Sequence, residues 1–354
     1  GLESMLSRPS RAANRFTYPI AGRVTASAVG TRCDFLNGFT DMAVVSRPNA
    51  PSTTKRRFSD ETISGWLSIS PWLIGFVVFT ATPFLASLYF SFTDYNVLNP
   101  PEWVGLKNYE RLLTDDRLLP KALQNTFIYA MMYVPLNIIS ALAVAMLLNK
   151  ARHFTGFFRT AYYLPSITPG VATAYLWVWI LNPNDGIVNS TLRSIGLPAP
   201  GWTVDPFWTK PTIVITEIWT LGASMLLYLA ALQGVPKDLY EASTLDGAGA
   251  WRKFKDVTLP MISGITFFVT TISVISALNV FTQGYVMFDE DGGPDNSALF
   301  VVMYLFKRAF GSGYFQMGYA SAIAWVLFLI ILVVTFIQFK FSKRWVYYEH
   351  DTRN

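Results

Sequence analysis

Six blocks of apolar residues, each about as long as a bilayer-spanning helix, divide the chain from residue 66 onwards. Shorter polar segments separate them, and none of the blocks contains a lysine or an arginine. A helix that crosses the hydrocarbon core of a bilayer needs about 20 predominantly apolar residues. The pattern therefore predicts an all-α integral membrane protein with six transmembrane helices, at 66–90, 125–148, 160–181, 212–232, 265–288 and 318–339.

Three prolines fall within these blocks. Pro135 lies inside the second block, and Pro165 and Pro169 lie in the first turns of the third. Membrane helices tolerate proline better than soluble helices do, because neighbouring groups can satisfy the freed backbone. We therefore expect kinks at these positions and no loss of either span.

Basic residues indicate the orientation, because cytoplasmic loops of membrane proteins are enriched in lysine and arginine. An even number of spans places both termini on one side. The richer set is Lys55, Arg56, Arg57, Lys150, Arg152, Arg159, Lys237, Arg252, Lys253, Lys255, Lys340, Lys343, Arg344 and Arg353; the poorer set is Lys107, Arg111, Arg117, Lys121, Arg193, Lys210, Lys307 and Arg308. We therefore expect the segments of the richer set, and both termini, in the cytoplasm.

Composition agrees with a membrane protein: 52% of the residues are hydrophobic and 14% are charged, whereas soluble domains carry roughly 25% charged residues. Cys33 is the single cysteine, which excludes an internal disulfide and a zinc site of CxxC type. The two histidines, His153 and His350, are far apart in sequence. We expect no metal, no cofactor and no nucleic-acid partner on this chain.

The two ends differ from the membrane domain, which we place at 66–345. Residues 1–65 are polar, without apolar periodicity, and are expected to form a disordered cytoplasmic tail. Four arginines between residues 8 and 23 are typical of a transit peptide, which is the alternative interpretation, but Met42 begins an ordinary polar leader. We therefore favour residues 1–41 as an extension outside the native mature protein. Residues 346–354 are expected to form a second cytoplasmic tail.

The segment 235–262, between the fourth and fifth blocks, has helical periodicity of its own. Pro236 can occupy the first turn of a helix, and Gly247 suits a chain reversal. Apolar residues recur at helical spacing on both sides of that glycine: Leu239, Ala242 and Leu245 before it, and Trp251, Phe254 and Val257 after it. The pattern predicts two short helices over 236–258, bent near Gly247. Their exposed apolar residues need a partner groove.

The same segment resembles the EAA signature of permeases from ATP-binding-cassette (ABC) importers. That signature is Glu-Ala-Ala, three residues, Gly, nine residues and Ile-x-Leu-Pro; this chain has Glu241-Ala242-Ser243, Gly247 and Val257-Thr258-Leu259-Pro260 at the same spacing. Segments 91–113, 124–129, 157–169 and 292–298 are also similar to sugar permeases of the maltose and glycerol-phosphate type. The resemblance covers about residues 66–345.

The resemblance implies that segment 235–262 is a cytoplasmic coupling loop that docks in a cleft of an ATPase subunit. It assigns coupling roles to Glu241, Ala242, Ser243, Asp246, Gly247, Phe254, Leu259 and Pro260. The chain contains no G-x-x-x-x-G-K-[ST] phosphate loop, so ATP and Mg²⁺ are expected on two separate ATPase subunits. The other implied partners are a second homologous permease, an external solute-binding protein and a sugar-like solute, in a bacterial inner membrane.

A few polar residues within the spans are candidates for the solute path. Glu217 lies inside the fourth block, and Ser276, Asn279 and Gln283 recur on one helical face of the fifth. Amides and hydroxyls suit sugar hydroxyls, and Trp219 can stack on a sugar ring. The alternatives are an interfacial acid for Glu217, interhelical hydrogen bonds for the polar face and lipid anchoring for the tryptophan.

Two other classes of function stay open at this point. An ion-gradient-driven secondary transporter or channel is expected to show paired charges within the membrane, or inverted repeats with broken helices. A membrane-embedded enzyme needs convergent catalytic groups. Neither pattern is evident in the sequence, so an importer permease without catalytic residues is the prediction that the sequence favours.

Overall fold

A computed structural model describes residues 60–151, 154–311 and 313–347 of the chain. The expectations for residues 1–59 and 348–354 lie outside these ranges. The chain divides into two units, Gly1–Ile63 and Ser64–Asn354, and the helical bundle belongs to the second. Helices make up most of the described residues, loops and turns connect them, and the described strands are one short antiparallel pair, β1 (Thr93–Asp94) and β2 (Glu102–Trp103). This confirms the all-α prediction.

The first predicted span is one continuous apolar helix. It comprises α1 (Asp60–Phe76), a π-helical turn η1 (Val77–Ala81) and α2 (Thr82–Ser91). The helix therefore begins a few residues before the predicted end of the polar tail at residue 65. Its most apolar 18-residue window has no buried residue. Only α2 packs closely on another helix, α16 (Met317–Ser342), where Trp325 donates to Ser87.

The second predicted span is the centre of the bundle. After α3 (Lys107–Thr114), helix α4 (Leu118–Lys150) runs for 33 residues, or about 50 Å. Ala141 and Ala145 on α4 have no solvent exposure. Small residues at these positions allow neighbouring helices to approach closely, and α9 and α13 pack here.

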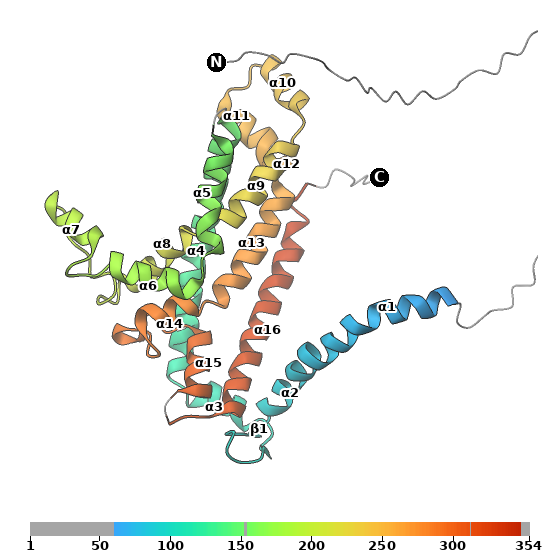
Figure 1. Ribbon diagram of the computed structural model, residues 1–354, viewed down its shortest axis with the longest axis vertical. Coiled ribbons are helices and arrows are strands. Elements are labelled where there is room, and N and C mark those ends of the chain that lie inside the picture. The colour runs from blue at the N-terminus through green and yellow to red at the C-terminus, as the bar shows by residue number, and fades with distance from the viewer. Residues whose placement is uncertain (1–59, 152–153, 312, 348–354) are drawn as a thin grey trace, which may run out of the picture. The chain divides into compact units, whose positions relative to one another are not determined.

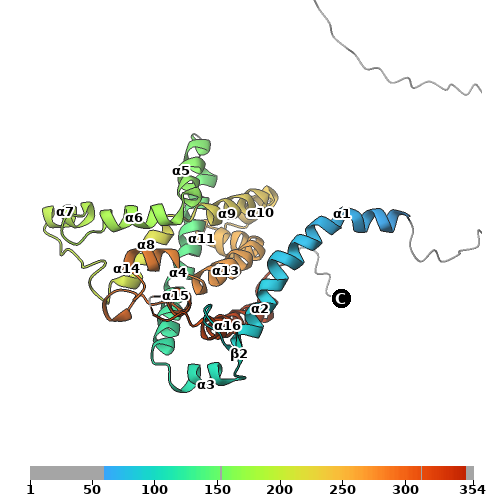
Figure 2. The same cartoon turned by 60° about the horizontal axis from the view of Figure 1, so that its bottom comes forward.

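The third predicted span is not a single helix. It consists of α5 (Thr155–Ile167) and α6 (Gly170–Ile180), which run in different directions, and α7 (Ile187–Ser194) follows them (Figures 1 and 2). The break lies at Thr168, whose ψ of 138° is extended, directly before Pro169. Proline disfavours the helical conformation of the residue before it, so the kink that we expected at this proline is a full interruption.

The fourth predicted span is bent by 50° between α8 (Thr209–Ile218) and α9 (Gly222–Gly234). Gly222 lies where α5 crosses α9. A Cβ atom there would be 2.4 Å from the carbonyl oxygen of Tyr162. Glycine is therefore required for the close approach of these two helices.

The remaining elements are the segment between the fourth and fifth predicted spans and the helices that follow it. That segment comprises α10 (Lys237–Leu245), α11 (Ala250–Lys253), π-helical η2 (Phe254–Thr258) and α12 (Leu259–Met261). Beyond it come α13 (Ser263–Leu278), α14 (Thr282–Phe288), the 3-10 turn η3 (Pro294–Asn296), α15 (Val301–Phe310) and α16. Figure 1 shows α10 and α11 at one end of the bundle, here the loop end, and β1 and α3 at the other, here the sheet end.

The predicted count of six spans is not confirmed. Four helices of the described chain are long and apolar enough to cross a membrane, and the bent α8–α9 pair makes up to five. The predicted third span is absent from this count because its break leaves α6 with 11 residues. That is about 17 Å of helix, shorter than the roughly 30 Å of a hydrocarbon core.

Candidate functional site

A pocket of about 220 Å³ contains four of the five residues that the sequence indicated for the solute path. We call it the Glu217 pocket. The fifth residue, Trp219, does not line it and instead packs edge-on against Trp177, with ring centroids 5.6 Å apart. The lining residues are Tyr129, Tyr133, Glu217, Ser276, Asn279, Val280, Phe281, Thr282 and Gln283.

The Glu217 pocket forms where two helices are interrupted. Glu217 lies one residue before the end of α8, at the bend into α9, and Asn279 follows the last residue of α13. The Asn279 side chain donates to the carbonyl of Ile275 at 2.8 Å and caps the end of that helix. Phe281, with φ −142° and ψ −62°, is non-helical. Interrupted backbone at membrane depth is tolerated where it is buried in protein or lines a water-filled cavity.

Two tyrosines of α4 complete the wall, and sequence reasoning missed them. Tyr129 and Tyr133 are one helical turn apart, and their rings stack with centroids 5.6 Å apart and planes 9° apart. Tyr129 is only 2% exposed and also packs on Phe300. The i, i+4 spacing of two tyrosines in a span was the available signal, since it places both rings on one face.

At the loop end, the two helices expected around Gly247 are present. Pro236 is the residue before α10, and Gly247 has a φ of +75°, a conformation that favours glycine. The Tyr240 hydroxyl lies 3.0 Å from that of Thr258, and the Lys253 ammonium donates to the Thr244 hydroxyl at 2.8 Å. These bonds hold the two arms of the loop against each other.

The surface of this loop is apolar and open. Leu245 is 90% exposed and Trp251 is 74% exposed, and the Trp251 ring packs on Phe254. An exposed apolar patch of this kind marks an interaction site. Between the loop and the ends of α4 and α9 lies a pocket of about 290 Å³, lined by Met146, Asn149, Lys150, Leu232, Tyr240, Ala250, Lys253, Phe254 and Thr258.

The predicted coupling residues are distributed over this loop. Glu241, Ala242 and Asp246 are exposed, and the Ser243 hydroxyl donates to the carbonyl of Tyr240. The ion pairs of the described chain are Arg252–Asp256 and Lys307–Asp291, so the Glu241 carboxylate is not in one. Leu259 and Pro260 begin α12, which leads into α13.

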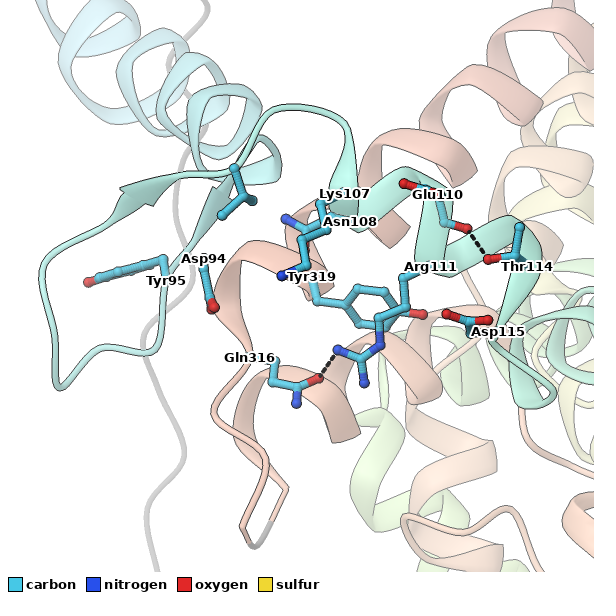
Figure 3. Close-up of a pocket in the computed structure, with 11 residues that line it drawn as sticks. Asp94, Tyr95, Lys107, Asn108, Glu110, Arg111, Thr114, Asp115, Gln316 and Tyr319 are labelled. Atoms are coloured by element: carbon cyan, nitrogen blue, oxygen red, sulfur yellow. Dashed lines mark hydrogen bonds between the residues drawn. The ribbon is translucent and has the colours of Figure 1, made fainter.

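A larger pocket, of about 350 Å³, opens at the sheet end (Figure 3). The Arg111 guanidinium lies 4.6 Å from the ring centroid of Tyr319 and 3.4 Å from the amide oxygen of Gln316. Asn108 donates to the carbonyls of Ser91 and Thr93, both at 2.9 Å, which fixes α3 against the end of α2. Acidic and basic side chains of this pocket are mixed. The lining consists of Asp94, Tyr95, Val104, Lys107, Asn108, Glu110, Arg111, Thr114, Asp115, Gln316 and Tyr319.

The Asp116 carboxylate fastens three helices together beside this pocket. It accepts from the backbone amides of Leu118 and Leu119 at 2.8 and 3.0 Å, at the start of α4, and from the hydroxyls of Tyr304 on α15 and Tyr319 on α16. Burial raises the pKa of this carboxyl, but the four donors outweigh burial, so its pKa lies below the ordinary value of 3.8.

Comparison with known proteins identifies the family of this chain. Residues 125–347 match the family described as "Binding-protein-dependent transport system inner membrane component". The chain belongs to this family. The permease is therefore a translocation subunit of an importer, not an enzyme. Membership decides against the membrane-embedded enzyme and the ion-gradient-driven transporter, although the structure does contain the broken helices that the latter was expected to show.

Relatives in sequence and in structure cover most of the permease. It is 40% identical over 83% of its length to the probable ABC transporter permease protein YesP of Bacillus subtilis (strain 168), covering 95% of that protein. It is 35% identical over 84% of its length to the lactose transport system permease protein LacF of Rhizobium radiobacter, covering 98% of that protein. A bacterial alginate ABC transporter, solved in complex with an alginate-bound periplasmic protein, shares the fold, with a TM-score of 0.70 at 22% identity, over 80% of this chain and 95% of that one.

Proposed function

We propose that the permease forms one half of the translocation pathway for a sugar or sugar-like solute, and that the Glu217 pocket is part of its wall. The observation that carries the proposal is the meeting of carboxylate, amide and hydroxyl groups at interruptions of two helices. In lipid such groups cost several kcal/mol unless they face protein or water. A hydroxyl-rich solute offers donors and acceptors to each of them.

The relatives support a sugar as the solute. LacF is named as a lactose permease, and AraP of Halalkalibacterium halodurans, 36% identical over 79% of this chain, as an arabinooligosaccharide permease. The complex of the structural neighbour with a periplasmic protein supports delivery by an external solute-binding protein. A second homologous permease supplies the other half of the pathway.

Coupling to ATP, in this proposal, runs through the loop at 235–262. Its open apolar surface, with Leu245 and Trp251 at the tip, fits a groove of a separate cytoplasmic ATPase subunit, which binds ATP and Mg²⁺. ATP-driven closure of two such subunits shifts the permease towards the outward-facing state. The excess of lysine and arginine at the loop end supports a cytoplasmic position for the loop and both termini, with 66–345 as the permease domain and 346–354 as a tail.

The double variant Asn279→Ala/Gln283→Ala tests the pocket. The complex is reconstituted in liposomes with its binding protein, and uptake is measured with labelled lactose and an arabinooligosaccharide as probes. We expect loss of uptake and of its stimulation of ATP hydrolysis, with normal subunit assembly and basal ATPase activity as controls. Wild-type affinity and rate in the double variant would show that these amides do not handle the solute.

A further inference from the structure

One acidic side chain, Glu217, sets the charge that the wall of the Glu217 pocket can carry. Glu217 is the one acidic residue of the lining, and the lining contains no lysine, arginine or histidine. The ion pairs of the described chain do not include Glu217. A cavity with low-dielectric walls and charge of one sign concentrates ions of the opposite sign and excludes ions of the same sign.

The hydrogen-bonding groups of the wall point to the same selectivity. An ionised carboxylate only accepts, whereas the Asn279 amide, which donates one N–H to Ile275, keeps a second N–H as a donor and its oxygen as an acceptor. The tyrosine hydroxyls and the Gln283 amide can donate. A sugar hydroxyl both donates and accepts, so it matches this mixture. A carboxylate or phosphate group on a solute only accepts, and it is repelled by Glu217.

We propose that Glu217 is a specificity-determining residue that favours neutral, hydroxyl-rich saccharides over acidic ones such as uronates and sugar phosphates. This inference rests on the proposed role of the pocket as part of the pathway. The structural neighbours import the acidic polysaccharide alginate, but at 22% identity they share the fold alone with this permease.

The charge of the pocket can be measured without knowledge of the natural solute. Ser276 is exposed and lines the pocket. In the assembled complex, with Cys33→Ser in the permease, a Ser276→Cys reporter is treated with cationic, anionic and neutral methanethiosulfonate reagents of similar size. A Ser194→Cys reporter on α7, outside the pocket, is the matched control, and the complex without a reporter corrects for other cysteines.

We expect the cationic-to-anionic ratio of modification rates at Ser276→Cys to fall by about seven-fold when Glu217→Gln is added. A unit charge that interacts with a monovalent ion by about RT changes the local concentration of that ion about 2.7-fold, and the two reagents respond in opposite directions. Glu217→Asp should keep the wild-type ratio, and neither variant should change the ratio at Ser194→Cys. In uptake assays, Glu217→Gln should weaken the discrimination between lactose and lactobionate.

Two results would overturn different parts of the reasoning. A ratio at Ser276→Cys that Glu217→Gln leaves unchanged, while the neutral reagent reacts normally, would refute charge selection and leave the pocket in the pathway. No reaction with the neutral reagent at Ser276→Cys in any nucleotide state, while Ser194→Cys reacts, would show that water does not reach the pocket. That outcome would refute the proposed pathway itself.

Discussion

Gly222→Ala is expected to destabilise the permease because the added methyl group has no room between α5 and α9. Its Cβ atom would lie 2.4 Å from the carbonyl oxygen of Tyr162 and 2.7 Å from the Cα atom of Tyr163. Both atoms belong to the backbone of α5, so no change of rotamer relieves the overlap. An ordinary contact begins at 3.4 Å, so the two helices must separate by about 1 Å.

Overpacking of this kind costs about 1–3 kcal/mol, and the better helix propensity of alanine returns up to about 1 kcal/mol. The net loss, centred on about 1–2 kcal/mol, should lower the midpoint of thermal unfolding by roughly 2–8 °C. The measurement is intrinsic fluorescence of the assembled complex in detergent during heating. A matched control exists in the same helix: a Cβ atom at Gly234 meets nothing within 4 Å, so Gly234→Ala should keep the wild-type midpoint or raise it. A Gly222→Ala midpoint at or above that of the wild type would refute the close-packing argument.

Two further changes test the ends of the bundle. Asp116→Asn should remove a stabilising contribution that is present above the ordinary carboxyl pKa and is lost as pH falls through the lowered folded-state pKa. The difference in thermal midpoint between the variant and the wild type should be constant above about pH 5 and shrink below about pH 4. A difference that stays constant down to about pH 3 would contradict this prediction. Gly247→Leu should abolish uptake with normal solute binding to the external protein, because a left-handed residue costs about 1–2 kcal/mol outside glycine and asparagine, and Gly247→Asn should retain more uptake. Glu241→Lys should also abolish uptake by placing a cation against the partner ATPase, and wild-type uptake at equal membrane abundance would contradict its coupling role.

The sequence predicted those features that depend on local pattern. Apolar blocks and their spacing identified α4, α13 and α16, because burial in lipid requires long uninterrupted apolar runs. The two helices around Gly247 followed from short apolar stripes on either side of a glycine. Glu217, Ser276, Asn279 and Gln283 were found because polar residues are costly in a span.

Other features depend on contacts that one sequence does not reveal. Pro169 indicated a disturbance of the third span, but whether a proline kinks or interrupts a helix depends on the packing around it. Tyr129 and Tyr133 could not be assigned to the pocket, because aromatic residues serve equally as core or as interface anchors. The connection of Asp116 to Tyr304 and Tyr319 joins residues that are 188 and 203 positions apart, which no local pattern encodes.

The positions of the two helix interruptions have a mechanical consequence. Helix α9 leads directly into the loop from one side, and α13 leaves it through α12 on the other. At their far ends, both helices stop beside the Glu217 pocket, after 13 and 16 residues, or about 20 and 24 Å. The loop and the Glu217 pocket therefore lie at opposite ends of the same two helices, α9 and α13. A tilt applied at the loop would be delivered at residues 219–221 and 279–281, which lie between the regular helices.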